Sequence, residues 1–180
     1  MASLRKANAY SKRKVTPYTR RSKKKSKSYV KTVPPQGIIK FTMGKENLFY
    51  QKKLPYTLAL VASEKVQIRA NALEACRQFV NKKLDKNFNG QYLFKVKPYP
   101  HHIQRENKML TGAGADRMQT GMQLAFGKTS TRAAIVKPGE QILFIAVANK
   151  KAEKFARDLF HKIRSKLPCK TKIIAEEVAK

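Results

Sequence analysis

The segment from Met109 to Met122 contains the residue types that most readily bring a protein backbone close to a phosphate. It holds small side chains and a single acid, and its glycines and nearby bases are Gly112, Gly114, Gly121, Arg105, Lys108 and Arg117. Glycine permits close backbone approach, and a segment with little to bury is expected to be a mobile loop. The composition fits a functional loop and an ordinary long hairpin connection equally well.

Neither common nucleotide-binding fingerprint is complete in this region. The dinucleotide fingerprint needs a third glycine at the position that Arg117 occupies. The ending of a P-loop is present at Gly127, Lys128 and Thr129, but the glycine required five positions before Gly127 is Met122. The loop is therefore not expected to cradle a free nucleotide.

Residues suited to catalysis or to metal binding are few and scattered. His101 and His102 are adjacent, so in a strand their side chains point to opposite faces, and neither has a second ligand at metal spacing. The 11 acids show no paired spacing, which makes an enzyme acting on RNA an unfavoured alternative. Cys76 is expected to be buried and Cys169 to lie near the surface, in a reducing compartment. We expect no metal, no cofactor and no catalysis.

The charge of the chain points to a polyanionic partner. Residues 1–45 contain 14 Lys or Arg and no acid, and the whole chain has 40 bases against 11 acids, a formal net charge of +29. Residues 1–33 are expected to form an extended arm that is disordered alone and folds onto its ligand. Tyr10, Tyr18 and Tyr29 are interleaved there and could stack on unpaired bases. The arm residues expected to contact RNA are Lys12, Arg13, Lys14, Tyr18, Arg20, Arg21, Lys23, Lys24 and Lys25, with Tyr10.

The rest of the chain is basic too, with 26 bases against 11 acids after residue 45. This distribution suits a partner that surrounds the protein. The longest strongly apolar run, Ile142 to Ala148, is far shorter than the roughly 20 residues of a membrane span. The basic, acid-free arm also resembles an organelle transit peptide, an alternative weakened by Pro17, Pro34 and Pro35.

Two amphipathic helices are expected in residues 34–180. The first has Val66, Ala70, Leu73, Cys76, Val80 and Leu84 on one face, with Ser63 as its cap, Glu64 at its dipole and Asn87 to Gly90 at its end. Its other face would present Arg69, Arg77, Lys82 and Lys83 to solvent or phosphate. The second runs from about Asn149 to Leu167, where Pro168 stops it, and its buried stripe is Ala152, Phe155, Ala156, Leu159, Ile163 and Leu167.

Strands are expected around these helices. Tyr56–Ala62, the stretch Tyr92–Glu106 with its Pro98 and Pro100, and Lys172–Ala175 are strand-like, and Thr131–Lys137 and Gln141–Val147 flank a hairpin signal at Pro138-Gly139. The predicted fold class is α+β: one mixed or antiparallel sheet with both helices on one face, in a single domain over residues 34–180.

The region that begins at Glu106 carries a resemblance to a known protein family. Glu106-Asn107-Lys108-Met109-Leu110 and Gly114-Ala115-Asp116-Arg117-Met118-Gln119-Thr120-Gly121-Met122 strongly resemble the archaeal and eukaryotic branch of a universal large-subunit ribosomal protein family, numbered sixteen in bacteria and ten in eukaryotes. Supporting matches are Asn71–Arg77, Phe126–Lys128, Val136–Gly139 and Leu167–Lys172. The resemblance covers about residues 33–175, whereas the Lys-rich run of the arm departs from the family.

The resemblance implies an α+β fold with a hammerhead-like strand arrangement and a cytoplasmic protein of the large ribosomal subunit. It implies binding to large-subunit rRNA near 5S rRNA, with tRNA as a transient partner, neighbouring ribosomal proteins, no cofactor and no membrane. Arg105, Lys108 and Lys128 would contact rRNA at the stem of the loop. The loop residues expected to reach toward the peptidyl-transferase centre are Met109, Leu110, Thr111, Gly112, Ala113, Gly114, Ala115, Asp116, Arg117, Met118 and Gln119. From charge alone, a DNA-compacting or chromatin-like protein is the alternative.

Overall fold

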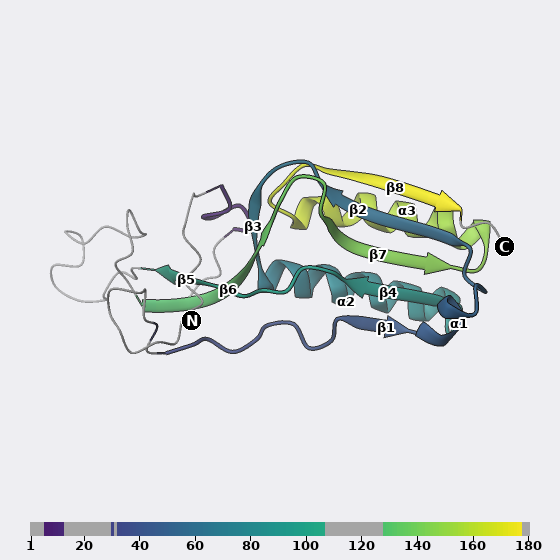
Figure 1. The fold of residues 1–180 in the computed structure, drawn as a ribbon, viewed down its shortest axis with the longest axis horizontal. Coiled ribbons are helices and arrows are strands. Elements are labelled where there is room, and N and C mark those ends of the chain that lie inside the picture. The colour runs from purple at the N-terminus through teal and green to yellow at the C-terminus, as the bar shows by residue number, and fades with distance from the viewer. Residues whose placement is uncertain (1–5, 13–29, 31, 107–127, 178–180) are drawn as a thin grey trace, which may run out of the picture.

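The computed structural model describes residues 6–12, 30, 32–106 and 128–177 of the 180-residue chain (Figure 1). In chain order its elements are β1 (Thr42–Gly44), α1 (Glu46–Tyr50), β2 (Tyr56–Ala62), β3 (Val66–Arg69), α2 (Ala70–Phe88), β4 (Tyr92–Val96), β5 (His102–Glu106), β6 (Lys128–Val136), β7 (Gln141–Val147), α3 (Lys150–Ile163), the short 3-10 helix η3 (Arg164–Lys166) and β8 (Thr171–Glu177).

A five-stranded antiparallel sheet forms the centre of the body, with strand order β1-β4-β7-β2-β8. The near-continuous apolar runs of β2 and β7 suit inner strands, because each of these strands has a neighbour on both sides. Helices α2 and α3 pack against one face of the sheet (Figure 1). The core between them joins Leu58, Phe94 and Ile145 of the sheet with Leu73, Val80, Leu84, Ala156, Leu159 and Ile163 of the helices.

The remaining strands form a second antiparallel sheet, with order β3-β6-β5. Glu106 at the end of β5 lies opposite Lys128 at the start of β6. The segment between them therefore connects two adjacent antiparallel strands. In Figure 1 this pair of strands extends away from the end of the body where the C-terminus lies. Glu106 and Lys128 thus mark the end of the projecting ladder.

The expected β6–β7 hairpin and the single sheet are wrong, because these consecutive strands belong to different sheets. The turn between them contains Gly139 at φ 85°. Instead of folding β7 back on β6, the turn binds the end of β2: Gly139 N donates to Ala62 O at 2.8 Å, and Ala62 N donates to Glu140 O at 3.0 Å. The apolar run of β7 pairs with β2 and β4, where both of its faces are covered.

The first helix begins later than its periodicity predicted. Val66–Arg69 is the strand β3, paired with β6, and the helix starts at Ala70 with Arg69 as its N-cap residue. Val66 and Ile68 are β-branched and alternate with polar residues, a pattern that also fits a strand. Ser63 is therefore not the cap, and Glu64 forms an ion pair with Lys12. The end of the helix is as expected: it stops at Phe88, before Gly90 at φ 73°.

Several other expectations are confirmed. Strand β2 has the predicted bounds, α3 with η3 spans the second predicted helix, and β8 contains the predicted last strand. Cys76 is fully buried and Cys169 is half-buried. His102 is buried while its neighbour His101 is exposed. The buried stripe of α3 also includes Phe160, which is not among the predicted residues.

Part of the predicted arm contacts the body instead of being extended. Residues 6–12 form turns, and Gln67 N of β3 donates to Ser11 O at 2.9 Å. The hydroxyl of Tyr10 donates to Glu106 Oε1 at 3.5 Å, and Ser11 is buried. The hydrogen bond between Gln67 N and Ser11 O therefore anchors residues 6–12 to the edge strand β3. None of the described helices is long and apolar enough to cross a membrane.

Candidate nucleic-acid interface

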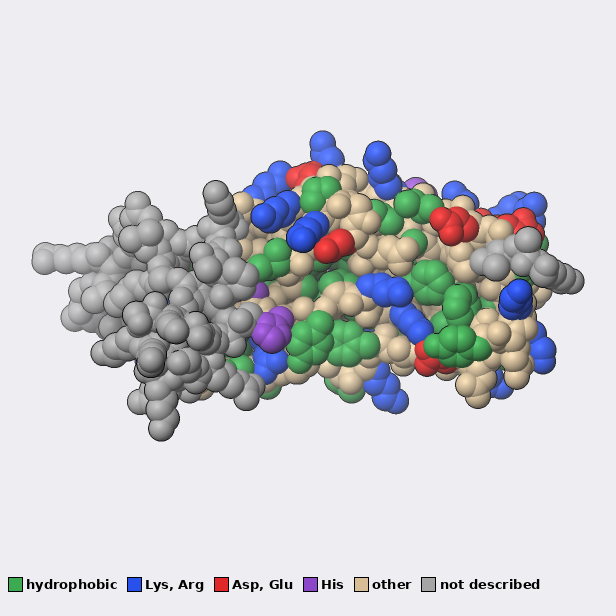
Figure 2. Space-filling view, in the orientation of Figure 1, with side chains coloured by type: hydrophobic (Ala, Val, Ile, Leu, Met, Phe, Trp, Pro, Cys, Tyr) green, Lys and Arg blue, Asp and Glu red, His purple; other side chains and the backbone are tan. Residues whose placement is uncertain are grey.

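Basic side chains are spread along the body instead of being gathered in one patch. Figure 2 shows Lys and Arg distributed over the visible face, between apolar patches and a smaller number of acids. The ion pairs among the described residues engage few of these bases, joining Glu64 to Lys12, Glu74 to Arg77, Glu46 to Lys95 and Glu153 to Arg157. Exposed bases that are not held in such pairs can bind phosphates over a large area.

Helix α2 presents two of the predicted rRNA-binding residues. Lys82 and Lys83 are exposed, as expected, and Lys86 in the last turn is exposed as well. These side chains lie away from the buried stripe of Leu73, Val80 and Leu84 that packs on the sheet. These lysines therefore form a solvent-facing basic surface on the outer side of α2.

Helix α3 and η3 add a second set of bases that are not among the predicted site residues. Exposed bases here include Lys151, Lys154, Lys162 and Lys166. These bases are three or four residues apart, or about two turns apart, opposite the apolar stripe, and this spacing indicates an outward-facing basic side of the helix. Because α2 and α3 pack on the same face of the sheet, their exposed bases belong to one helical layer. We name this layer the helical basic surface, formed by Lys82, Lys83, Lys86, Lys151, Lys154, Lys162 and Lys166.

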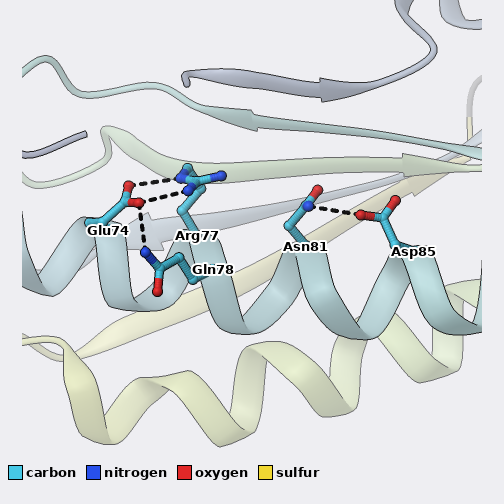
Figure 3. Close-up of polar contacts among 5 residues, drawn as sticks. All are labelled: Glu74, Arg77, Gln78, Asn81 and Asp85. Atoms are coloured by element: carbon cyan, nitrogen blue, oxygen red, sulfur yellow. Dashed lines mark hydrogen bonds and ion pairs between the residues drawn. The ribbon is translucent and has the colours of Figure 1, made fainter. Parts of the chain in front are cut away.

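Arg77 does not lie free on that surface, which corrects the prediction. Its Nε donates to Glu74 Oε2 at 2.7 Å and its Nη2 donates to Glu74 Oε1 at 2.6 Å (Figure 3). Only 10% of the Arg77 side chain and 13% of the Glu74 side chain are exposed. The hydrogen bond from Arg77 is the largest cause that lowers the pKa of Glu74. A base one turn from an acid on the same helix face is paired before any phosphate arrives.

Arg69 is also buried, because it ends β3 and does not lie on an outer helix face. Its Nε donates to Gln104 Oε1 at 3.2 Å, and Gln104 Nε2 donates to Gln67 Oε1 at 3.0 Å. This polar chain lies across the three-stranded sheet, between residues of β3 and β5. Arg69 is thus a structural residue of the three-stranded sheet, and the expectation that it is accessible to phosphate is wrong.

The other described candidates lie at or near the stem of the loop. Arg105 in β5 is half-buried, and Lys128 at the start of β6 is exposed. The side chain of Lys12 is 73% exposed, and its Nζ lies 3.0 Å from Glu64 Oε2. This contact is the largest cause that lowers the pKa of Glu64. In the antiparallel ladder Arg105 lies opposite Thr129 and Lys128 lies opposite Glu106, so both bases belong to the same end of the ladder although they are far apart in sequence.

The remaining predicted site residues lie outside the described ranges and stay predictions. In the arm these are Arg13, Lys14, Tyr18, Arg20, Arg21, Lys23, Lys24 and Lys25. In the segment between β5 and β6 they are Lys108 and the loop residues from Met109 to Gln119.

A polar groove between β1 and α2 was not anticipated from the sequence. Its volume is about 560 Å³, and its lining includes the exposed bases Lys40 and Lys45. The side of the groove formed by α2 includes Asn81 and Asp85 from the row of polar residues in Figure 3. Asn81 Nδ2 donates a hydrogen bond to Asp85 Oδ2 at 2.9 Å. The Tyr92 hydroxyl binds Asp85, and burial followed by that hydrogen bond raises the pKa of Tyr92. The groove is a polar crevice with cations at its rim.

The buried titratable groups of the described chain lack the arrangement of an active site. Burial raises the pKa of Cys76 to about 12 and that of Cys169 to about 11, so neither thiol is activated. Burial also lowers the pKa of His102. No group of three or more His, Cys, Asp or Glu within residues 6–12, 30, 32–106 and 128–177 is placed to hold a metal ion.

The described residues form a basic α+β body with a projecting β-ladder and a helical basic surface, an arrangement that suits a folded polyanionic partner. Residues 13–174 match the family described as Ribosomal protein L16p/L10e. The chain is 40% identical over 174 residues to the large ribosomal subunit protein uL16 of Pyrobaculum arsenaticum, covering 96% of this chain and 92% of the relative.

Other archaeal relatives agree. Identity is 41% over 172 residues to the uL16 protein of Staphylothermus marinus, covering 95% of this chain and 92% of the relative. It is 42% over 173 residues to that of Sulfolobus acidocaldarius, covering 94% and 92%. The chain therefore belongs to the Ribosomal protein L16p/L10e family. It is a structural ribosomal protein and not an enzyme, and the family resemblance found in the sequence is confirmed.

Proposed function

We propose that the chain is a structural component of the large ribosomal subunit that binds large-subunit rRNA near 5S rRNA and the tRNA sites. The observation that carries this proposal is the family match over residues 13–174, on a chain with a net charge of +29. The relatives named above are themselves large-subunit proteins. Their similarity extends over nearly the full length of both chains.

The surface of the body supports binding to a folded RNA. The helical basic surface places cations on two adjacent helices, and further exposed bases, Lys40 and Lys45, lie at the groove beside α2. Phosphates of several RNA segments repel one another when they pack together, and exposed Lys side chains reduce that repulsion. Bases on many sides of the protein suit an RNA that encloses it.

The segment between β5 and β6 has a separate role in this proposal. The loop residues Met109 to Gln119 would reach toward the peptidyl-transferase centre and support the positioning of tRNA, while RNA performs the chemistry. The ladder of β5 and β6 would hold the two ends of the loop in place, with Arg105 and Lys128 at its stem. A rigid ladder below a glycine-containing loop is a common way to position a functional segment.

Two measurements test the proposal. If eight duplex phosphates are contacted, a plot of log affinity against log salt for the cognate rRNA fragment has a slope of roughly −7. A slope near zero would remove the electrostatic account. Competition with duplex DNA at physiological salt separates this function from DNA compaction, because an rRNA-binding protein should prefer the structured rRNA strongly.

The loop is tested by deleting residues 110–118 from the full chain. Folding should be nearly unchanged, because the segment has little to bury, whereas translation by ribosomes that carry the variant should slow. A variant in which the same residues are replaced by a glycine-serine stretch of equal length controls for the change in chain length. Normal elongation rates with the deletion would contradict the role of the loop.

A further inference from the structure

Tyr99 is a large aromatic side chain held in the open by a rigid stretch of backbone. It is 52% exposed and lies in the connection between β4 and β5. Pro98 precedes it and Pro100 follows it, the first half-buried and the second buried. Each proline fixes its own φ near −65°, so the Tyr99 side chain is presented with little backbone freedom to lose on binding.

One face of the Tyr99 ring is supported from below. The ring stacks on Phe41, with centroids 5.6 Å apart and planes inclined by 26°. Phe41 is partly buried and packs against the hydrophobic core. The exposed His101 ring lies 6.1 Å away at 52°. The aromatic group therefore begins in the core at Phe41 and ends at an exposed ring, which is the form of a stacking platform.

A cavity of about 360 Å³ lies beside Tyr99, and it is lined by Lys97, Pro98, Tyr99, Ile135, Glu140 and Gln141. Phe41 is not part of this lining, so the cavity borders a different side of Tyr99 from the stacked ring. The exposed Lys97 ammonium lies 5.5 Å from the centroid of Phe144 and can meet a phosphate at the rim. The site thus combines an aromatic surface, apolar walls and one cation.

The acid in this cavity decides which part of a nucleotide would occupy it. Glu140 Oε2 accepts a hydrogen bond from Lys137 N at 2.8 Å, which fixes the carboxylate at the cavity. A carboxylate repels a phosphate, but it accepts hydrogen bonds from the amino groups of bases, and the Gln141 amide can both donate and accept. The lining therefore suits a base, with its phosphate outside near Lys97.

We propose that the platform of Tyr99 on Phe41 stacks an unpaired nucleobase of the bound RNA. This inference rests on the proposed function, since it names a subsite within the rRNA interface. Unpaired bases stack on exposed aromatic side chains, and each such contact contributes measurably to affinity. A partner protein could also cover Tyr99, but the adjacent Lys97 and the net charge of +29 favour a nucleic acid.

The test compares two probes that carry the same phosphates and differ only in their bases. The full chain is titrated with an adenylate oligoribonucleotide of about ten residues and with an abasic oligomer of equal length. Tyr99→Ala should weaken binding of the adenylate probe roughly fivefold or more and leave binding of the abasic probe unchanged. Tyr99→Phe, which keeps the ring, should bind both probes as the unmodified chain does.

Tyr50 provides a matched control, because it is 71% exposed and its hydroxyl donates to Glu46 Oε1 at 3.2 Å. Its ring meets Phe49 edge-on instead of stacking on it. Tyr50→Ala should change neither affinity, and the tyrosines of the arm contribute the same background to every variant. Equal weakening of both probes by Tyr99→Ala, or no weakening of either, would overturn the subsite.

A second measurement uses the protein in its assembled state. Ultraviolet irradiation of large subunits that contain the chain should cross-link Tyr99 to an rRNA nucleotide. A cross-link from Tyr99 to a neighbouring protein would overturn the inference in favour of a protein partner. Because the salt dependence of rRNA binding is measured independently, it can remain steep while the subsite fails, so the two proposals are separable.

Discussion

The guanidinium of Arg77 faces the carboxylate of Glu74 one turn earlier on α2, through two hydrogen bonds of 2.7 and 2.6 Å. The pairing matches the fork of donors on arginine to the two oxygens of a carboxylate. Lys82, further along the same helix, is exposed. Two bases that look equivalent in the sequence therefore differ in role: Arg77 stabilises the fold, and Lys82 is available to a ligand.

Replacement of Arg77 should reduce stability. Arg77→Ala leaves the largely buried carboxylate of Glu74 without its main partner, so we expect the free energy of unfolding to decrease by roughly 2 kcal/mol. Lys82→Ala, at an exposed site of the same helix, should change it by less than about 0.5 kcal/mol. Urea unfolding followed by circular dichroism measures both. Equal stability of the two variants would show that the Arg77–Glu74 pair contributes nothing.

For RNA binding we expect the opposite ranking, in which the lysines of α2 matter more than Arg77. Replacing both Lys82 and Lys83 by alanine should make the salt slope for the cognate rRNA fragment shallower by roughly 1 to 2. Arg77→Ala, measured under conditions where it is folded, should leave this slope unchanged, because its guanidinium is already paired. A slope altered by Arg77→Ala and not by the lysine variant would reverse the assignment of these residues.

Much of the architecture was predictable because the periodicity of apolar residues reports burial directly. The stripe of α3 and the apolar run of β2 each fit one kind of element, and both were predicted correctly. Val66 fits the helix face that contains Ala70, and it equally fits a strand in which it alternates with Ile68. The choice depends on Ala134 and Val136 of β6, which pair with them from a distant part of the sequence. Local pattern cannot supply that partner.

The candidate site was less predictable for a related reason. Exposed lysines such as Lys82 follow from the helical pattern alone. The burial of Arg69 depends on Gln104, which β5 brings alongside β3 through their shared neighbour β6. The Tyr99 platform likewise requires Phe41, which lies far from Tyr99 in the sequence. Contacts across strands decide these roles, and composition does not encode them.

Acid should destabilise the folded chain through His102. Burial lowers the pKa of this residue below its ordinary 6.5 in the folded state. Between the two pKa values the unfolded chain binds a proton that the folded chain does not, so unfolding is favoured as the pH falls. The contribution of His102 to stability is thus fully present above about pH 6.5 and decreases below it. Unfolding free energies measured from pH 7.5 down to pH 5 would reveal the slope.

The matched variants are His102→Gln and His101→Gln. The first removes the buried titrating group, so its stability should fall less steeply with acid than that of the unmodified chain. The second alters the exposed neighbour and should keep the original slope. If both variants follow the unmodified chain between pH 7.5 and pH 5, burial of His102 does not cause the acid sensitivity.

The glycine at the end of β1 should tolerate no side chain. Gly44 has φ 87°, and a Cβ added there would lie 2.2 Å from Tyr92 O. That carbonyl accepts a hydrogen bond from Lys45 N at 3.0 Å, so it cannot move aside without losing the contact between β1 and β4. Gly44→Ala should therefore lower the free energy of unfolding by about 3 kcal/mol or more, through backbone strain and steric overlap together.

Gly139 separates these two causes. Its φ of 85° is nearly the same, but a Cβ added there would meet nothing within 4 Å. Gly139→Ala should thus show the backbone term alone, a loss of about 1 kcal/mol. Urea denaturation of both variants gives the difference directly. If the two losses were equal, the close approach of Gly44 to Tyr92 would have no energetic effect, and β1 would be free to shift at the edge of the sheet beside the groove with α2.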